Sequence, residues 1–204
     1  MRVLVLGATG GTGRHVLEQA IASGHEVTAL VRDPTTLGTI EGVRTLTGDA
    51  TNPVDVRAGL DGQEGVLNAL GSRSLRRPVE ADSTAILVGE AERVGIQRFV
   101  VCSAFGVGDT RDGANLLQRA FFSSMLRRVY AAKEVADAAV RDSTLDWTLV
   151  YPTRLTNTPP TGRILAVESF SGVGRVSRAD VARFLVEQLE SSVWSRKTVI
   201  VSGR

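Results

Sequence analysis

Apolar residues along the chain follow two alternating patterns. Short, nearly continuous apolar runs, such as residues 3–6 and 99–102, are typical of strands buried on both faces of a parallel sheet. Between these runs apolar residues recur at helical spacing. One such stripe extends from Leu87 to Val94 and is followed by Gly95, a residue that commonly ends a helix. The pattern therefore predicts strands that alternate with helices.

The expected elements form a doubly wound parallel sheet, the Rossmann architecture. Right-handed crossovers between successive strands give the strand order 3-2-1-4-5-6-7. Helices are expected at 52–60, at 87–94, from about 114 to 141, and after a capping box made by Ser177 and Asp180. The predicted strands are residues 3–6, 26–31, 43–47, 65–70, 99–102, 147–150 and 197–201.

The alternation breaks down between residues 152 and 176, a stretch rich in Pro, Thr and Gly. We interpret this stretch as a substrate-side loop or hairpin insertion that forms a small C-terminal lobe. The alternative is a surface excursion with a small hairpin around residues 163–168. Residues 1–204 as a whole are predicted to form a single domain.

A glycine-rich turn joins the first strand to the first helix. Gly7, Gly10 and Gly13 are spaced as G-x-x-G-x-x-G, and Thr9 and Thr12 lie between them. A chain that turns this sharply needs residues without a Cβ, and a dinucleotide pyrophosphate needs bare backbone N–H groups at a helix N-terminus. The turn therefore predicts a dinucleotide site, and the alternative is a tight turn without a ligand.

Ligands bind doubly wound sheets beyond the carboxyl ends of the strands, where the strand order reverses. This rule predicts which residues converge on the cofactor. Gly11 belongs to the glycine turn itself, and the segments after the later strands complete the set. These segments supply Arg32, Asp49, Ala50, Leu70, Gly71, Ser103, Tyr151, Pro152 and Thr153, with Arg73, Phe105, Tyr130 and Arg154 expected on the substrate side.

The end of the second strand indicates which nicotinamide cofactor is bound. An acid there accepts from the adenosine ribose of NAD, whereas a cation suits the 2′-phosphate of NADP. Arg32 precedes Asp33, so NADP is favoured if Arg32 faces the ribose and NAD if Asp33 does; a solvated pair at a turn is the alternative. Asp49 could accept from the adenine amino group, although a Gly48–Asp49 turn carries the same residues.

Composition limits the classes of partner and the location that are expected for this protein. The chain is 43% hydrophobic and 23% charged, and its net charge of +2 gives no reason to expect nucleic acid or a membrane as the main partner. Cys102 is the sole cysteine, and neither a signal peptide nor an apolar span of about 20 residues is present, so a cytoplasmic location is expected. His15 and His25 are expected at the surface, and no metal site is expected. A monomer is predicted, with a dimer as the alternative; Phe121 and Phe122 could belong to an interface or to a substrate lid.

Several motifs resemble those of the atypical short-chain dehydrogenase/reductases. Within that group the chain looks most like the NmrA-like NAD(P)H-binding proteins similar to flavin reductase/biliverdin reductase B. The resemblance implies a Rossmann fold, and it implies that Lys133 contacts the cofactor ribose or the nicotinamide amide. The motifs that carry it lie at residues 5–13, 30–34, 48–49, 101–104, 142–152 and 177–182.

The candidate catalytic residues are Ser103 and Lys133. Typical short-chain dehydrogenases combine a Ser with Tyr-x-x-x-Lys, but Tyr130 and Lys133 are one residue too close to meet that motif. Tyr130 is therefore interpreted as a packing aromatic. The alternatives are that Lys133 pairs with Asp137 or extends to solvent, and that Ser103 only caps its strand.

These observations predict an NADPH-dependent reductase that transfers hydride to a flavin, a quinone or a similar conjugated ring. The resemblance implies chemistry without the tyrosine–lysine pair, in which proximity and orientation dominate and solvent supplies the proton. One alternative is a non-catalytic NADP-binding redox sensor that acts through a protein partner. Another is a carbonyl reductase that uses Tyr130 and Lys133.

Overall fold

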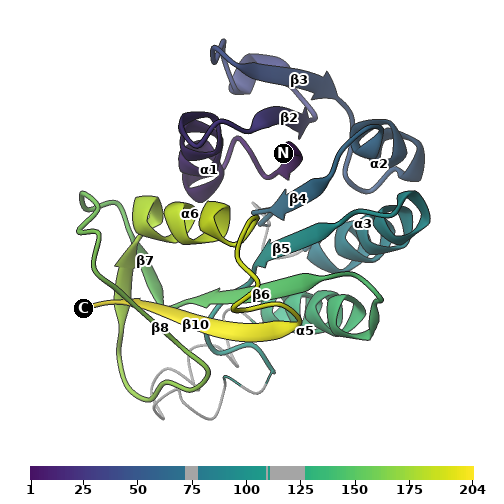
Figure 1. Cartoon of the computed structure of the whole chain (residues 1–204). Coiled ribbons are helices and arrows are strands. Elements are labelled where there is room, and N and C mark those ends of the chain that lie inside the picture. The colour runs from purple at the N-terminus through teal and green to yellow at the C-terminus, as the bar shows by residue number, and fades with distance from the viewer. Residues whose placement is uncertain (72–77, 109, 111–126) are drawn as a thin grey trace.

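A computed structural model describes residues 1–71, 78–108, 110 and 127–204. Its centre is an eight-stranded sheet of order β3-β2-β1-β4-β5-β6-β10-β8 (Figure 1). All neighbouring strands are parallel except β10 and β8. With β10 as the seventh strand, the predicted order 3-2-1-4-5-6-7 is confirmed. The strands are β1 (Arg2–Leu6), β2 (Glu26–Val31), β3 (Val43–Thr47), β4 (Gly65–Asn68), β5 (Arg98–Cys102), β6 (Trp147–Pro152), β8 (Ile164–Val167) and β10 (Lys197–Gly203).

Helices cover both faces of this sheet (Figure 1). Side chains alternate along each strand, so Val3 and Val5 pack toward one face while Leu4 and Leu6 pack toward the other. The first core lies under α1 (Gly11–Ala22) and α6 (Arg178–Glu187). The second lies under α2 (Pro53–Leu60), α3 (Glu80–Val94) and α5 (Arg127–Asp142). The beginning of the long helix expected from residue 114 lies outside the described residues.

The segment after β6 contributes strands of its own. β7 (Arg154–Thr156) and β9 (Arg175–Ser177) form a separate parallel pair. β8 does not fold into a hairpin around residues 163–168, and that alternative is wrong. It joins the edge of the main sheet, where Val167 lies opposite Ile200 of β10 in antiparallel register.

Two expectations about exposure are wrong. His25, expected at the surface, is only 7% exposed, and its Nδ1 lies 3.4 Å from the N-terminal nitrogen of Met1. Val94, expected in the buried stripe of α3, is 41% exposed: the stripe ends at Ala91 and extends toward the start of the helix through Thr84 and Ser83. Polar residues in that stripe hide it from a search for apolar spacing.

The boundaries of α6 follow from its first turn. Ser177 is the N-cap, and its Oγ accepts from the backbone N–H of Asp180 at 3.0 Å, as the capping box predicts. The Asp180 carboxylate does not complete the box at the Ser177 backbone, because it accepts instead from the N–H groups of Thr161 and Gly162. The cap therefore also holds a distant loop.

Within the described residues, no helix is both long enough and apolar enough to cross a membrane.

Candidate dinucleotide-binding cleft

The turn between β1 and α1 depends on glycine at two positions. Gly7 has φ +76°, and a Cβ built on it would lie 2.4 Å from the carbonyl oxygen of Ala69. A Cβ built on Gly13 would lie 2.0 Å from the carbonyl oxygen of Gly7. Both contacts are too short for any side chain, so the turn packs directly on the chain leaving β4 and on the first turn of α1. Gly13, predicted to bind cofactor, lies behind the turn as a packing residue.

The first turn of α1 is suited to an anion. The first N–H groups of a helix have no acceptor within the helix, and together they carry the positive end of its dipole. Gly10 is the N-cap and supplies no side-chain hydrogen bond, and the first turn contains no acidic residue. These features fit the pyrophosphate of a dinucleotide.

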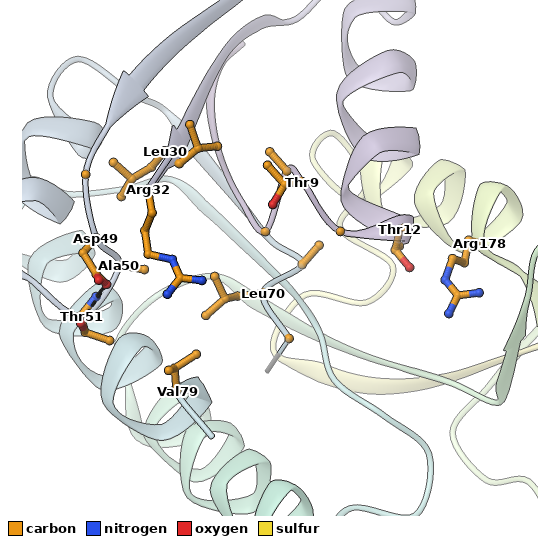
Figure 2. Close-up of a pocket in the computed structure, with 18 residues that line it drawn as sticks. Thr9, Thr12, Leu30, Arg32, Asp49, Ala50, Thr51, Leu70, Val79 and Arg178 are labelled. Atoms are coloured by element: carbon orange, nitrogen blue, oxygen red, sulfur yellow. Dashed lines mark hydrogen bonds between the residues drawn. The ribbon is translucent and has the colours of Figure 1, made fainter. Parts of the chain in front are cut away.

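A cleft of about 520 Å³ opens above this turn, at the carboxyl ends of β1 to β4 (Figure 2). Ten of the predicted cofactor residues line it, which is the convergence that the topology rule requires. These ten are Gly7, Thr9, Gly10, Gly11, Thr12, Arg32, Asp49, Ala50, Leu70 and Gly71.

Eight further residues of the cleft wall were not predicted. Most are immediate sequence neighbours of predicted residues, and a wider window around each strand end would have included them. Val79 and Arg178 are different, because they come from segments that the motifs did not assign to the site. The eight are Ala8, Leu30, Val31, Gly48, Thr51, Ala69, Val79 and Arg178.

Arg32, and not Asp33, is directed to the cleft. Asp33 caps the short 3-10 helix η1 (Pro34–Thr36), and its Oδ1 accepts from the N–H of Thr35 at 2.9 Å and from the Thr35 hydroxyl at 2.6 Å. These hydrogen bonds lower the pKa of Asp33. The Arg32 guanidinium extends into the cleft between Asp49 and Leu70 (Figure 2). The arrangement places a cation where the second strand ends.

Asp49 forms a turn and lines the cleft as well. Its Oδ1 accepts from the N–H and from the hydroxyl of Thr51, each at 2.8 Å. These two hydrogen bonds, with a smaller contribution from the charge of Arg32, lower the pKa of Asp49. The Gly48–Asp49 turn expected as the alternative to adenine binding is therefore present, and Oδ1 of Asp49 stabilises it. The Asp49 side chain nevertheless lines the cleft together with Arg32.

A second polar centre lies where β5 and β6 end, against α5. The Ser103 hydroxyl and the Tyr151 hydroxyl each donate to Oδ2 of Asp137 at 2.7 Å, and Arg141 donates to the Tyr151 oxygen at 2.8 Å. Asp137 is 2% exposed. Burial raises its pKa, against the opposing effect of these hydrogen bonds and of the charges of Lys133 and Arg141. The Tyr151 side chain therefore serves this centre, and neither Tyr151 nor Ser103 belongs to the described wall of the cleft.

Lys133 lies one helical turn before Asp137 and is half-buried. Burial raises the pKa of Asp137 and raises that of Cys102 to about 11, and the charge of Lys133 opposes both shifts. Pairing of Lys133 with Asp137 stays an alternative. A role for Lys133 toward cofactor remains a prediction.

The remaining predicted residues surround this second centre. Tyr130 donates its hydroxyl to the carbonyl oxygen of Phe105 at 3.2 Å, and burial raises the pKa of Tyr130 to about 12. The ring of Phe105 meets that of Phe170 edge to face at 5.7 Å. Thr153 donates to the Ser202 hydroxyl at 3.3 Å and so joins β6 to β10.

The other predictions fall on Pro152, Arg154 and Arg73. Pro152 ends β6 and Arg154 begins β7. Arg73, like Phe121 and Phe122, lies outside the described residues. In the part of the chain that the structure describes, no three His, Cys, Asp or Glu side chains are grouped so that they could hold a metal ion.

Comparison with known proteins agrees with this geometry. Residues 7–192 match the family described as NAD(P)H-binding. The chain belongs to that family. The resemblance inferred from the motifs is thereby confirmed, and NAD(P)H is the cofactor class that the family binds.

One relative and three solved structures show how widely the fold is shared. An uncharacterised chloroplast protein of Arabidopsis thaliana is 30% identical over 100% of this chain and 77% of its own length. An oxidoreductase of Lactococcus lactis has a TM-score of 0.87 at 22% identity, covering 100% of this chain and 91% of that one. The anaerobilin reductase ChuY of Escherichia coli has a TM-score of 0.84 at 24% identity, covering 100% and 97%. A short-chain dehydrogenase/reductase of Veillonella parvula in complex with NADP has a TM-score of 0.81 at 18% identity, covering 98% and 94%.

Proposed function

We propose that this protein is an NADPH-dependent reductase that transfers hydride to a conjugated ring, with flavins and quinones as the acceptor class. The observation that carries the acceptor class is that the two candidate hydroxyls, those of Tyr130 and Ser103, are both engaged in hydrogen bonds. Tyr130 donates to the Phe105 carbonyl and Ser103 donates to Asp137. A carbonyl acceptor needs a proton donor at its oxygen, whereas a conjugated ring can take its proton from solvent after hydride transfer.

The preference for NADPH rests on Arg32. A guanidinium matches a phosphate with paired N–H donors, and Arg32 occupies the position from which the adenosine ribose is recognised in this fold. The Asp33 carboxylate, which would favour NAD, is committed to capping η1. The residues of the cleft therefore fit a cofactor that carries a 2′-phosphate.

The protein's own residues bind and orient the cofactor, which when bound supplies the hydride. The N–H groups at the start of α1 would hold the pyrophosphate, Arg32 would hold the 2′-phosphate, and residues at the end of β5 would hold the nicotinamide. There Ser103 presents oxygen lone pairs, because its proton is directed to Asp137. Ser103 is thus suited to accept from the amide of the nicotinamide, and the charge of Lys133 acts on Asp137, the carboxyl to which Ser103 donates.

The structural neighbours share the fold and do not identify the acceptor. An oxidoreductase and an anaerobilin reductase share the fold at TM-scores of 0.87 and 0.84. At 22% and 24% identity these likenesses extend to architecture alone. The acceptor class accordingly depends on the hydrogen bonds around Ser103 and Tyr130.

The proposal is tested by titrating the protein with NADPH and NADH and then adding FMN or a simple quinone. We expect NADPH to bind more tightly than NADH and to be oxidised when acceptor is added. Ser103→Ala should lower turnover about 10-fold through loss of one hydrogen bond to the cofactor, whereas Ser192→Ala, at an exposed position, should leave it unchanged. Tight NADPH binding without oxidation by any acceptor would instead favour the redox sensor.

A further inference from the structure

An arginine far along the chain reaches the glycine turn. Arg178 is the first residue of α6, and it lines the cleft together with Gly11 and Thr12. A Cβ built on Gly11 would lie 2.9 Å from Nε of Arg178. Figure 2 shows Arg178 and Arg32 on opposite sides of Thr9, so the two guanidinium groups flank the turn.

Neighbouring residues hold the Arg178 side chain in this place. It is half-buried, and its Nη1 donates to Oδ1 of Asn157 at 2.7 Å. The backbone that carries it is fixed by the Ser177 cap.

The two cations along the cleft match the two phosphate-bearing parts of the cofactor, the 2′-phosphate and the pyrophosphate. Arg32 lies at the end of β2, where a 2′-phosphate is recognised, and Arg178 lies beside the N–H groups that hold a pyrophosphate. The acid on the described wall, Asp49, is engaged by Thr51. A cation beside Gly11 is therefore positioned for a negatively charged ligand directly above the turn.

We propose that Arg178 is the second cation of the dinucleotide site and that it binds the pyrophosphate. The inference rests on the proposed cofactor site and extends it to a residue that no strand-end motif supplies. Because NADPH and NADH share the pyrophosphate, Arg178 contributes equally to both. Arg32, in contrast, contributes to NADPH alone.

Arg178 also connects the cofactor to the segment after β7. Asn157 lies in that segment, and Asp180, on the same turn of α6, accepts from Thr161 at 2.9 Å and from Gly162 at 3.0 Å. The first turn of α6 thus holds residues 157–162 at three points. A phosphate bound by Arg178 restrains the same turn, so dinucleotide binding should slow amide hydrogen exchange in 157–162.

The decisive experiment compares dissociation constants for NADPH and NADH, measured by calorimetry without any acceptor. Arg178→Ala should weaken both by the same factor, about 10- to 100-fold, as expected for a charge-assisted hydrogen bond. Arg32→Ala should weaken NADPH selectively. Asn157→Ala is the matched control, since it removes the partner of Arg178 and keeps the cation; its affinities should stay within about threefold of wild type.

Each outcome decides the inference. Unchanged affinities in Arg178→Ala would overturn the assignment of Arg178 to the pyrophosphate while leaving the proposed function intact. A selective loss of affinity for NADPH would instead assign Arg178 to the 2′-phosphate. Wild-type protein that binds neither dinucleotide would overturn the proposed function as well. If Arg178→Ala does not fold, Arg178→Gln, which keeps an amide donor for Asn157 but loses the charge, should give the same equal losses.

Discussion

The Ser103 hydroxyl donates its proton to the buried carboxylate of Asp137, 2.7 Å away. A hydroxyl has one proton, so Ser103 can only accept hydrogen bonds from any other partner while this bond is kept. Tyr151 donates to the same oxygen of Asp137. The carboxyl group thereby fixes the direction of two hydroxyls at the ends of neighbouring strands, and its ionisation determines whether that direction is maintained.

The raised pKa of Asp137 predicts a pH-dependent stability. Below pH 3.8, the ordinary pKa of the group, the carboxyl is protonated in both the folded and the unfolded chain. As pH rises from there through the raised folded pKa, the unfolded chain loses its proton first, so this group's contribution to the free energy of unfolding declines. Asp137→Asn cannot ionise, and its stability relative to wild type should therefore rise with pH across the interval between the unfolded and the raised folded pKa.

Urea unfolding at a series of pH values measures this difference. Tyr151→Phe is the control, because it removes one donor and keeps the carboxyl, so the decline of stability with rising pH should persist. A constant difference between Asp137→Asn and wild type, or one that shrinks as pH rises, would show that burial does not govern this carboxyl.

Arg32→Ala should lower the affinity for NADPH about 10- to 100-fold and that for NADH less than about threefold. The reason is that the 2′-phosphate alone distinguishes the two cofactors. Asp33→Ala should lose the cap on η1 and lower the free energy of unfolding slightly, without changing either affinity. If Asp33→Ala weakened NADH binding, the result would show that the Asp33 carboxylate, and not the Arg32 guanidinium, contacts the adenosine ribose.

Gly13→Ala should destabilise the fold and weaken dinucleotide binding together. The added Cβ would lie 2.0 Å from the Gly7 oxygen, and relief of that overlap displaces the turn at a cost of about 1 to 3 kcal/mol. Gly89→Ala is the matched control, because Gly89 lies within α3 with open space around its Cα. That change should stabilise the protein by about 0.5 to 1 kcal/mol and leave NADPH binding unaltered. Thermal unfolding and cofactor titration of both variants test the contrast.

Tyr130→Phe should keep most of the reductase activity, within about threefold, because its hydroxyl is bonded to Phe105 and the raised pKa of Tyr130 makes it a poor proton donor at neutral pH. Stability should fall by about 1 kcal/mol with the loss of that hydrogen bond. Steady-state turnover with NADPH and a quinone is the measurement. A loss of 100-fold or more in turnover would favour the alternative in which the protein is a carbonyl reductase that uses Tyr130 and Lys133.

Periodicity was sufficient to predict most of the sheet. Unbroken apolar runs define strands buried on both faces, and the handedness of the crossovers then determines their order. β8 was not predicted as a strand of the main sheet because its pairing partner, β10, comes about thirty residues later in the chain. Short strands with distant partners leave little local pattern. His25 was misplaced for a related reason, since its burial depends on the N-terminal end of β1.

The cleft was predictable wherever it follows strand ends. Gly10, Arg32 and Asp49 could be placed on its wall from topology alone. Arg178 could not, because only the packing of α6 against α1 brings it beside Gly11. The hydrogen bonds from Ser103 and Tyr151 to Asp137 could not be predicted either, since they depend on side-chain directions that residue spacing does not determine.

The position of β10 between β6 and β8 sets an order for folding. β8 precedes β10 in the chain, yet β10 is its only neighbour in the sheet among the described strands. β8 therefore cannot join the sheet until β10 has paired with β6, a contact between segments about fifty residues apart. Closing so long a loop is slow compared with forming the adjacent β1–β2 unit. The nucleotide-binding half should accordingly assemble early, and the segment between β7 and β9 should be the last part of the molecule to become protected during refolding.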